Sequence, residues 1–211
     1  MEPSGAERKV LRKPHRVWTP GRRLMGNVLP MLIALPPAIL GVVLMITRGE
    51  ILGLGLALFA VSPVLGWIAT NYLGLFQNKK MKRELELRLR SSRQKLPSSR
   101  YFVGIATPTF KGLIDPHEDV GFLILHGDEI EFWGDSLNII IAKQEIRDVR
   151  FRPNIHTLIG LGRWVSIEGE IGGKPVRLAV EVRDRSTLIG NLRRSKALRQ
   201  RLLQWLGEKG S

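Results

Sequence analysis

The sequence predicts a two-helix transmembrane hairpin followed by a mainly β domain of about seven antiparallel strands, capped by a C-terminal helix. Three observations lead to this fold class. Two long runs near the N-terminus lack charged residues, short segments beyond residue 100 alternate between apolar and polar side chains, and the last segment carries an apolar stripe at helical spacing. The 211-residue chain therefore divides into a membrane part and a smaller folded part.

The uncharged runs cover residues 24–47 and 51–76 and contain no Asp, Glu, Lys or Arg. At about 1.5 Å per helical residue, either run is long enough to cross the ~30 Å hydrocarbon core of a bilayer. Only Arg48, Gly49 and Glu50 separate the runs, which favours a tight turn. We therefore expect a helical hairpin over residues 24–76 whose second helix returns to the starting side.

The positive charge is concentrated on both flanks of the hairpin. The net charge is +14; residues 1–23 hold seven Lys or Arg against two acids, and residues 77–99 hold eight against two. Cytoplasmic segments next to spanning helices carry such an excess of Lys and Arg. This indicates a multi-pass protein of the cell (inner) membrane with both termini cytoplasmic, and residues 1–23 as a basic cytoplasmic tail.

Composition also disfavours several classes of function. The chain has no cysteine, which rules out disulfides, thiolate catalysis and Cys-ligated zinc, and which fits a reducing compartment. Nucleic-acid binding is disfavoured because residues 100–211 are nearly balanced in charge and carry no familiar nucleic-acid motif. The first apolar run is also longer than the core of a cleaved signal peptide.

Small residues recur every four positions on the second predicted helix and favour close packing of helices. They are Gly53, Ala57, Gly66, Thr70 and Gly74. Three uses stay open: packing within the hairpin, homo-oligomerisation, and docking to a larger membrane complex. No ionisable residue lies within either run, which disfavours a proton or ion pathway formed by this chain alone.

Residues 77–99 are expected to form a basic helical connector. Met81, Leu85 and Leu89 recur every four residues, and two Glu–Arg pairs lie at helical spacing. The connector would either leave the membrane as a stalk or lie on its surface. In the second case its basic side chains would contact the anionic headgroups of the bilayer; these are Lys79, Lys80, Lys82, Arg83, Arg88 and Arg90.

The remainder, residues 100–211, reads as short strands and one helix. The expected strands are residues 100–106, 120–125, 129–133, 137–142, 146–151, 163–170 and 174–182. Gly-containing turns separate several of them, and the alternation predicts that each strand buries one face. Asp184 or Ser186 is the expected cap of a final helix. Its apolar stripe comprises Leu188, Leu192, Leu198, Leu202, Trp205 and Leu206.

This order of elements resembles the pleckstrin-homology (PH) superfold, including the PH-like and GRAM-type domains that follow transmembrane hairpins in bacterial membrane proteins. Residues 137–149, with the sequence LNIIIAKQEIRDV, are similar to the family's strand, short turn and "I-x-x-V" strand. The resemblance covers residues 100–211. Its phosphoinositide site is not carried over, because the corresponding loop, residues 107–115, holds only one lysine.

One dense polar cluster, Asp115-Pro116-His117-Glu118-Asp119, offers carboxylates and an imidazole for metal binding or acid–base chemistry. No ligand spacing typical of a metal site is present, and an acidic loop with a proline is usually a solvated turn. We interpret the cluster as such a turn. A short Gly-rich stretch, residues 154–162, is expected to be a flexible loop.

The function most consistent with these features is a non-enzymatic, membrane-tethered binding module, or scaffold, that recruits a protein or lipid partner and needs no cofactor. Two alternatives remain open. The chain would be an accessory subunit of a larger membrane complex if its small-residue stripe docks to other helices. It would be a membrane-bound, metal-dependent hydrolase if the cluster around His117 binds an ion.

Overall fold

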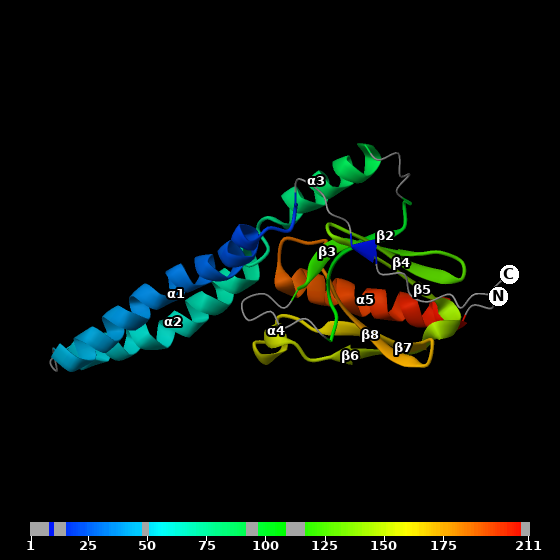
Figure 1. Ribbon diagram of the computed structural model, residues 1–211. Helices are drawn as coiled ribbons and strands as arrows, with labels where there is room; N and C mark the ends of the chain where they lie inside the picture. The colour runs from blue at the N-terminus through cyan, green and yellow to red at the C-terminus, as the bar shows by residue number, and fades with distance from the viewer. Residues whose placement is uncertain (1–8, 11–15, 48–50, 92–96, 109–116, 208–211) are drawn as a thin grey trace.

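The computed structural model describes residues 9–10, 16–47, 51–91, 97–108 and 117–207. Two antiparallel helices, α1 (Pro20–Thr47) and α2 (Leu52–Leu73), form a hairpin that extends away from a β domain (Figure 1). Both helices are long and apolar enough to cross a membrane, and most of their surface is exposed. The two predicted helices of the hairpin are therefore confirmed as helices.

The first helix begins before the uncharged run because of a capping motif. The Thr19 hydroxyl accepts a hydrogen bond of 3.3 Å from the backbone N–H of Arg22. Pro20 follows at the first helical position, where the missing N–H costs no hydrogen bond and the fixed backbone angle suits a helix. The Thr-Pro pair thus sets the start of α1.

Small residues bring the two helices close together. A Cβ atom at Gly41 would lie 2.7 Å from the carbonyl oxygen of Gly55, so a larger residue would push the backbones apart. Near the middle of the hairpin, the Ser62 hydroxyl donates a hydrogen bond of 2.6 Å to the carbonyl oxygen of Ala34. This close approach provides van der Waals contact along the length of the hairpin.

Among the described residues, the β domain contains seven strands of six to nine residues, each confirmed to within one residue of its predicted ends. They are β2 (Arg100–Ala106), β3 (Asp119–Leu125), β4 (Glu129–Gly134), β5 (Leu137–Ala142), β6 (Ile146–Arg152), β7 (Trp164–Ile171) and β8 (Lys174–Val182). The 3-10 turn η2 (Lys143–Glu145) joins β5 to β6, and the short helix α4 (Ile155–Leu158) precedes β7.

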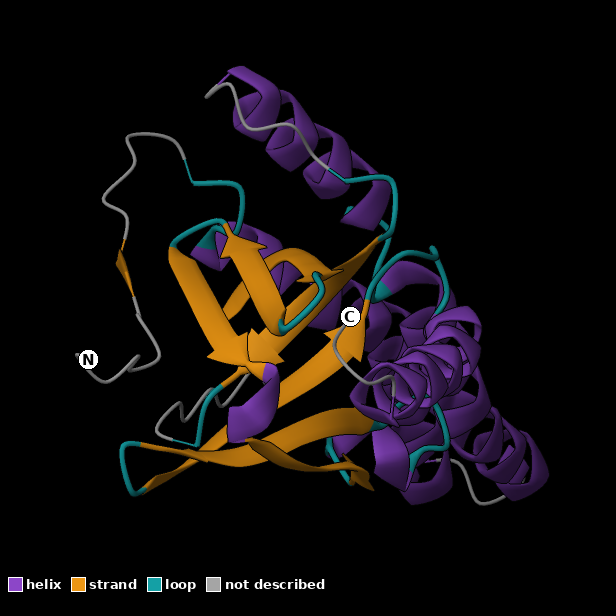
Figure 2. Ribbon diagram, turned by 90° about the vertical axis from the view of Figure 1, so that its right-hand side faces the viewer, coloured by secondary structure: helices purple, strands orange, loops and turns teal. Residues whose placement is uncertain are grey.

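All neighbouring strands in the sheet are antiparallel. Their order is β1-β5-β4-β3-β2-β8-β7-β6, where β1 is Lys9–Val10, so β2 joins a four-strand half to a three-strand half. The two halves face each other across the domain (Figure 2). The added edge strand β1 (Lys9–Val10) pairs with β5 from within the basic tail and was not predicted.

The main core lies between the two halves of the sheet and is covered by the helix α5 (Leu188–Gly207). Leu198, Leu202 and Trp205 are buried in this core, as the apolar stripe predicts. The indole N–H of Trp205 donates a hydrogen bond of 2.7 Å to the carbonyl oxygen of His126. The predicted cap was wrong: the hydroxyl of Thr187 accepts the hydrogen bond from the Gly190 N–H.

A second core covers the outer face of the sheet. The helix α3 (Asn78–Ser91) buries Met81, Leu85 and Leu89 against Phe102 of β2 and Phe122 of β3. Val17 and Trp18, which precede the hairpin, complete this core. The connector therefore packs along the sheet, which neither the stalk nor the lipid-surface arrangement anticipated. The packed unit extends beyond residues 100–211, the range expected from sequence.

Candidate functional site

The base of the hairpin is fastened to the β domain, and this contact region is the best candidate for a functional site. The Trp67 indole N–H donates a hydrogen bond of 2.9 Å to the carbonyl oxygen of Ile159, in the loop after α4. One turn further along α2, the side chain of Asn71 accepts a hydrogen bond of 3.1 Å from the backbone N–H of Ile189. The β domain thus contacts the last two turns of α2.

Apolar packing reinforces these hydrogen bonds. Leu75, which follows α2, packs with Leu161 and Leu188 in a small buried cluster. Burial of large aliphatic side chains stabilises by roughly 1.5–3 kcal/mol each. Hydrogen bonds and packing together therefore hold the domain in one position relative to the hairpin.

A buried polar cluster continues the contact region into the domain. We name Trp18, Asn78, His117, Glu181 and Arg183 the junction cluster. Asn78 donates to the backbone carbonyl of Arg183 at 3.1 Å and accepts from the Nε of the same arginine at 3.1 Å. His117 Nε2 lies 3.1 Å from a Glu181 carboxylate oxygen. The cluster joins the start of α3 to the end of β8.

The interpretation of His117 as part of a solvated turn was wrong. Its imidazole is buried over Gly104 of β2, and its ring centroid lies 5.1 Å from that of Trp164. Nδ1 lies 3.4 Å from the guanidinium of Arg183, which in turn lies over the indole ring of Trp18. The imidazole is enclosed by aromatic and charged side chains, an arrangement that suits a structural linkage better than contact with a substrate.

Asp119 is buried as well, so the solvated-turn interpretation was also wrong for this carboxylate. One of its oxygens accepts hydrogen bonds of 2.9 Å from the backbone N–H groups of Ser136 and Leu137. Burial raises the pKa of Asp119 to about 6, although these hydrogen bonds lower it. Residues 115 and 116 of the predicted cluster lie outside the described residues.

Within the described residues, no group of three His, Asp or Glu side chains is arranged to hold a metal ion. His117 and Asp119 also face different partners, Glu181 and the β4–β5 turn. These placements separate the residues that the hydrolase alternative requires to act together. That alternative remains a prediction with no observation in its favour among the described residues.

The six basic residues predicted for the membrane surface fall into two groups. Lys82 pairs with Asp184 at 2.7 Å, and Arg88 pairs with the buried Asp135, so both hold α3 on the β domain. Asp135 also accepts a hydrogen bond of 2.9 Å from the backbone N–H of Trp18. The other four are exposed on α3: Lys79, Lys80, Arg83 and Arg90. Their contact with headgroups stays a prediction.

The five predicted helix-packing residues also fall into two groups, those that face α1 and those that do not. Gly66 and Gly74 face α1, where added Cβ atoms would lie 3.1 Å from the Ala34 side chain and 3.7 Å from the Gly26 carbonyl oxygen. Thr70 donates to the carbonyl oxygen of Gly66 within its own helix. Gly53 has open space around it and Ala57 is exposed, so neither takes part in the hairpin contact.

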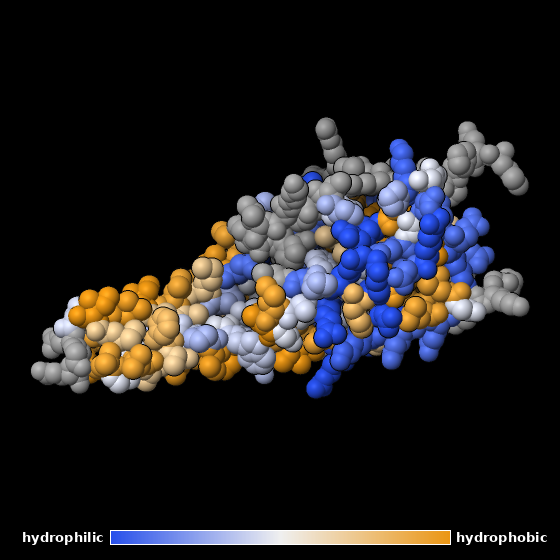
Figure 3. Space-filling model, turned by 90° about the horizontal axis from the view of Figure 1, so that it is seen from below, coloured by the Kyte–Doolittle hydropathy of each residue, from blue (hydrophilic) through white to orange (hydrophobic). Residues whose placement is uncertain are grey.

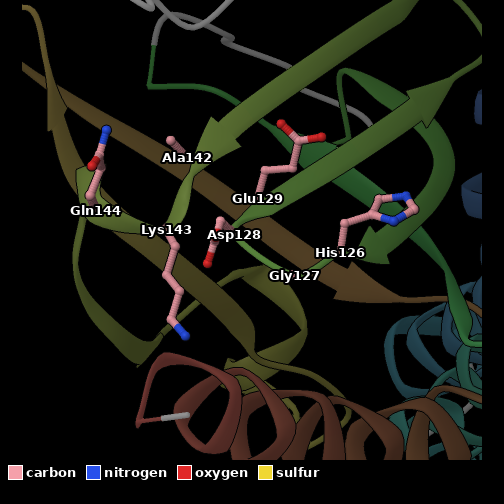
Figure 4. A pocket seen from close by; sticks show the side chains of 7 residues that line it. All are labelled: His126, Gly127, Asp128, Glu129, Ala142, Lys143 and Gln144. Atoms are coloured by element: carbon pink, nitrogen blue, oxygen red, sulfur yellow. The ribbon is translucent and has the colours of Figure 1, made fainter. Parts of the chain in front are cut away.

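Open hollows also lie elsewhere on the described part of the domain, and two of them are large. One, of about 660 Å³, lies between the β3–β4 turn and η2, and is lined by residues 126–129 and 142–144 (Figure 4). The other, of about 520 Å³, includes Arg150, Arg152 and Glu168. Hydrogen bonds from Arg152 and Arg150 lower the pKa of Glu168, so the carboxylate offsets part of the basic charge there.

Comparison of this chain with protein-family models and with curated proteins gives no match. Residues of the junction cluster other than His117 were not anticipated from sequence. Trp18 and Asn78 lie in segments expected to be a tail and a connector, and their partners are far away along the chain.

Proposed function

We propose that this protein is a membrane-anchored binding module with its β domain on the cytoplasmic face of the cell membrane. One observation carries the proposal: segments before and after an exposed apolar hairpin pack into a single folded body. Trp18 lies before α1 and Asp135 lies after α2, and they are joined by a hydrogen bond. Both ends of the hairpin are therefore on the same side of any membrane that it crosses.

The surface of the hairpin supports the membrane location. Large apolar side chains are exposed along both helices, including Leu32, Ile39, Ile46, Leu54 and Val64. Figure 3 shows hydrophobic residues gathered on the hairpin and hydrophilic residues gathered on the domain. An apolar exterior of this extent stays dispersed in lipid and not in water. The excess of Lys and Arg on the domain side favours the cytoplasm.

The arrangement of strands supports a PH-like recognition domain. Four strands and three strands meet at β2, and α5 covers the core between them. The exposed side of α3 displays Lys79, Lys80, Arg83 and Arg90, whose charge suits an anionic lipid surface or an acidic protein segment. We expect the module to hold such a partner at the membrane.

Topology reporters test the proposal. A reporter that is active only outside the cytoplasm should be silent when it is fused before Met1 or after Ser211, and active when it is inserted at Gly49. An active C-terminal fusion would overturn the cytoplasmic placement. Recovery of the full chain in the soluble fraction would overturn the membrane anchor.

A second function, accessory subunit of a membrane complex, is favoured by the outward position of Gly53 and Ala57. Gly53→Leu should leave the hairpin intact because nothing lies within 4 Å of an added Cβ atom. Gly55→Leu is the matched variant that disrupts the hairpin itself, since Gly41 lies against it. The measurement is the set of chains that co-purify with the protein in mild detergent. If the Gly53→Leu variant is obtained in normal yield but loses these chains, the role as an accessory subunit is supported.

A further inference from the structure

Two apolar side chains at the tip of the α4 turn face away from the domain. We name Leu158 and Ile159 the α4 tip. Leu158 is 82% exposed, more than any other large apolar side chain among the described residues; Ile46 in the hairpin follows at 78%. Ile159 is also exposed. Two exposed apolar side chains do not stabilise a turn that faces water, and polar residues are favoured at turn tips.

The turn that carries these side chains is closed by its own hydrogen bonds. The Asn154 side chain accepts from the backbone N–H of Thr157 at 3.0 Å, and the Thr157 hydroxyl donates to the carbonyl oxygen of Gly162 at 2.8 Å. Leu161 anchors the turn in the buried contact with Leu75 and Leu188. This capping motif closes a segment that the sequence predicts to be a flexible loop. The α4 tip is held in place by the fold.

The α4 tip lies beside the lipid-facing part of the hairpin. The carbonyl oxygen of Ile159 accepts the hydrogen bond from Trp67, which lies six residues before the end of α2, or about 9 Å along the helix. From Leu52 to Trp67 the helix rises about 22 Å, which is less than the ~30 Å hydrocarbon core. A bilayer that covers the hairpin from its tip therefore reaches the level of Ile159.

We propose that the α4 tip enters the bilayer and forms a second membrane contact of the β domain. The proposal rests on the proposed membrane location of the hairpin. Leu158 and Ile159 supply the apolar contact, and the Trp67 indole satisfies a carbonyl group that would otherwise lack water at this depth. Figure 3 also shows hydrophobic residues at the end of the domain nearest the hairpin, with paler and hydrophilic residues between them and the hairpin. The contact fixes which face of the domain points away from the membrane.

Single-cysteine labelling of the full chain tests the proposal, because the native sequence contains no cysteine. The probe is a polarity-sensitive fluorophore on Leu158→Cys, in phosphatidylcholine vesicles that contain phosphatidylglycerol. We expect its emission to shift to the blue, to be quenched by bromine on the acyl chains, and to be protected from iodide in the water. Leu158 is so exposed that the label should not disturb the fold.

Labels at two other positions serve as references for the result. Leu56→Cys reports the lipid-facing side of α2, and Lys174→Cys reports the water-facing β7–β8 turn. A Leu158 label that behaves like the Leu56 label supports the proposal. A Leu158 label that behaves like the Lys174 label, or is shielded from both quenchers, overturns it and leaves the membrane hairpin intact. If the Leu56 label is itself quenched by iodide, the proposed membrane location fails.

Discussion

Gly104 marks a close approach between β2 and His117 of the junction cluster. The imidazole of His117 lies directly over its Cα atom, where any side chain would overlap the ring. Glycine within a strand often marks such an approach. Burial of His117 thus depends on a residue 13 positions earlier in the chain.

Replacement of Gly104 by alanine should destabilise the protein. The added methyl group would overlap a buried ring that is fixed by Glu181 and Trp164, and overpacking of this kind costs about 1–3 kcal/mol. Thermal melts of the purified protein in detergent measure the effect. The matched control is Gly127→Ala, whose added atom meets nothing within 4 Å. Equal melting temperatures for the two variants would contradict the packing of His117 described above.

Asp119 should make stability depend on pH. Its pKa is raised from 3.8 to about 6, so the folded protein binds the proton more tightly than the unfolded chain does. The resulting stabilisation is fully present below about pH 4 and is lost as the pH rises through about 6, a change of about 3 kcal/mol. Asp119→Asn removes this titration while it keeps an acceptor for Ser136 and Leu137.

The measurement is the melting temperature of the native protein minus that of Asp119→Asn, followed from pH 4 to pH 7. We expect this difference to fall with rising pH. The exposed Asp128, replaced by Asn and measured in the same way, is the matched control for the change of residue type. A flat profile for Asp119 would show that its carboxyl group titrates normally in the folded state.

The segment around His117 has the sequence features of a solvated turn, because its composition is acidic and includes a proline. Burial of His117 and Asp119 depends on Gly104, Trp164 and the β4–β5 turn, which are distant in sequence. Local composition contains no information about such partners. The glycine inside a strand was the one available signal, and it indicates a close approach without naming the neighbour.

Among the elements, α3 departs furthest from its expected role. The four-residue repeat of Met81, Leu85 and Leu89 correctly predicts its apolar stripe. The repeat does not predict the partner of that stripe, because a helix next to a membrane can bury its apolar face in lipid or in protein with the same pattern. The strands were predicted well, since turns and alternation are local signals.

Leu85→Ala should distinguish packing on the sheet from contact with lipid. Leu85 is fully buried against the β domain, and its truncation should cost about 2–5 kcal/mol of folding free energy. Leu87 lies on the same helix and is 58% exposed, so Leu87→Ala should change stability by about 0.5 kcal/mol or less. Chemical unfolding in detergent, followed by tryptophan fluorescence, compares the two. A larger effect at Leu87 would favour the lipid-surface arrangement.

At the scale of the whole molecule, the β domain and the connector are one packed unit. The outer face of β2 and β3 displays Phe102, Phe122 and Ile124, which α3 covers. A fragment of residues 100–211, which the sequence suggested as an independent domain, leaves this face in water. The sequence boundary at residue 99 follows a change of composition and not a change of packing.

A fragment of residues 77–211 should therefore be more stable than one of residues 100–211. Restoration of Met81, Leu85 and Leu89 buries three large side chains at roughly 1.5–3 kcal/mol each, which is comparable with the whole stability of a small domain. Circular dichroism melts and size-exclusion chromatography test this. We expect the shorter fragment to melt earlier and to aggregate. Equal behaviour would contradict the second core.

The hydrogen bond between Trp18 and Asp135 also has a consequence for biosynthesis. Its partners are 117 residues apart, and both helices of the hairpin are made between them. At about 5–20 residues per second, a ribosome needs roughly 6 to 23 s to supply the second partner after the first. During that interval the β-domain surface that covers Trp18 is incomplete. With the membrane location proposed above, the hairpin would enter the bilayer before the domain folds, and closure of the domain around Trp18 would then hold the hairpin in the orientation that it has reached.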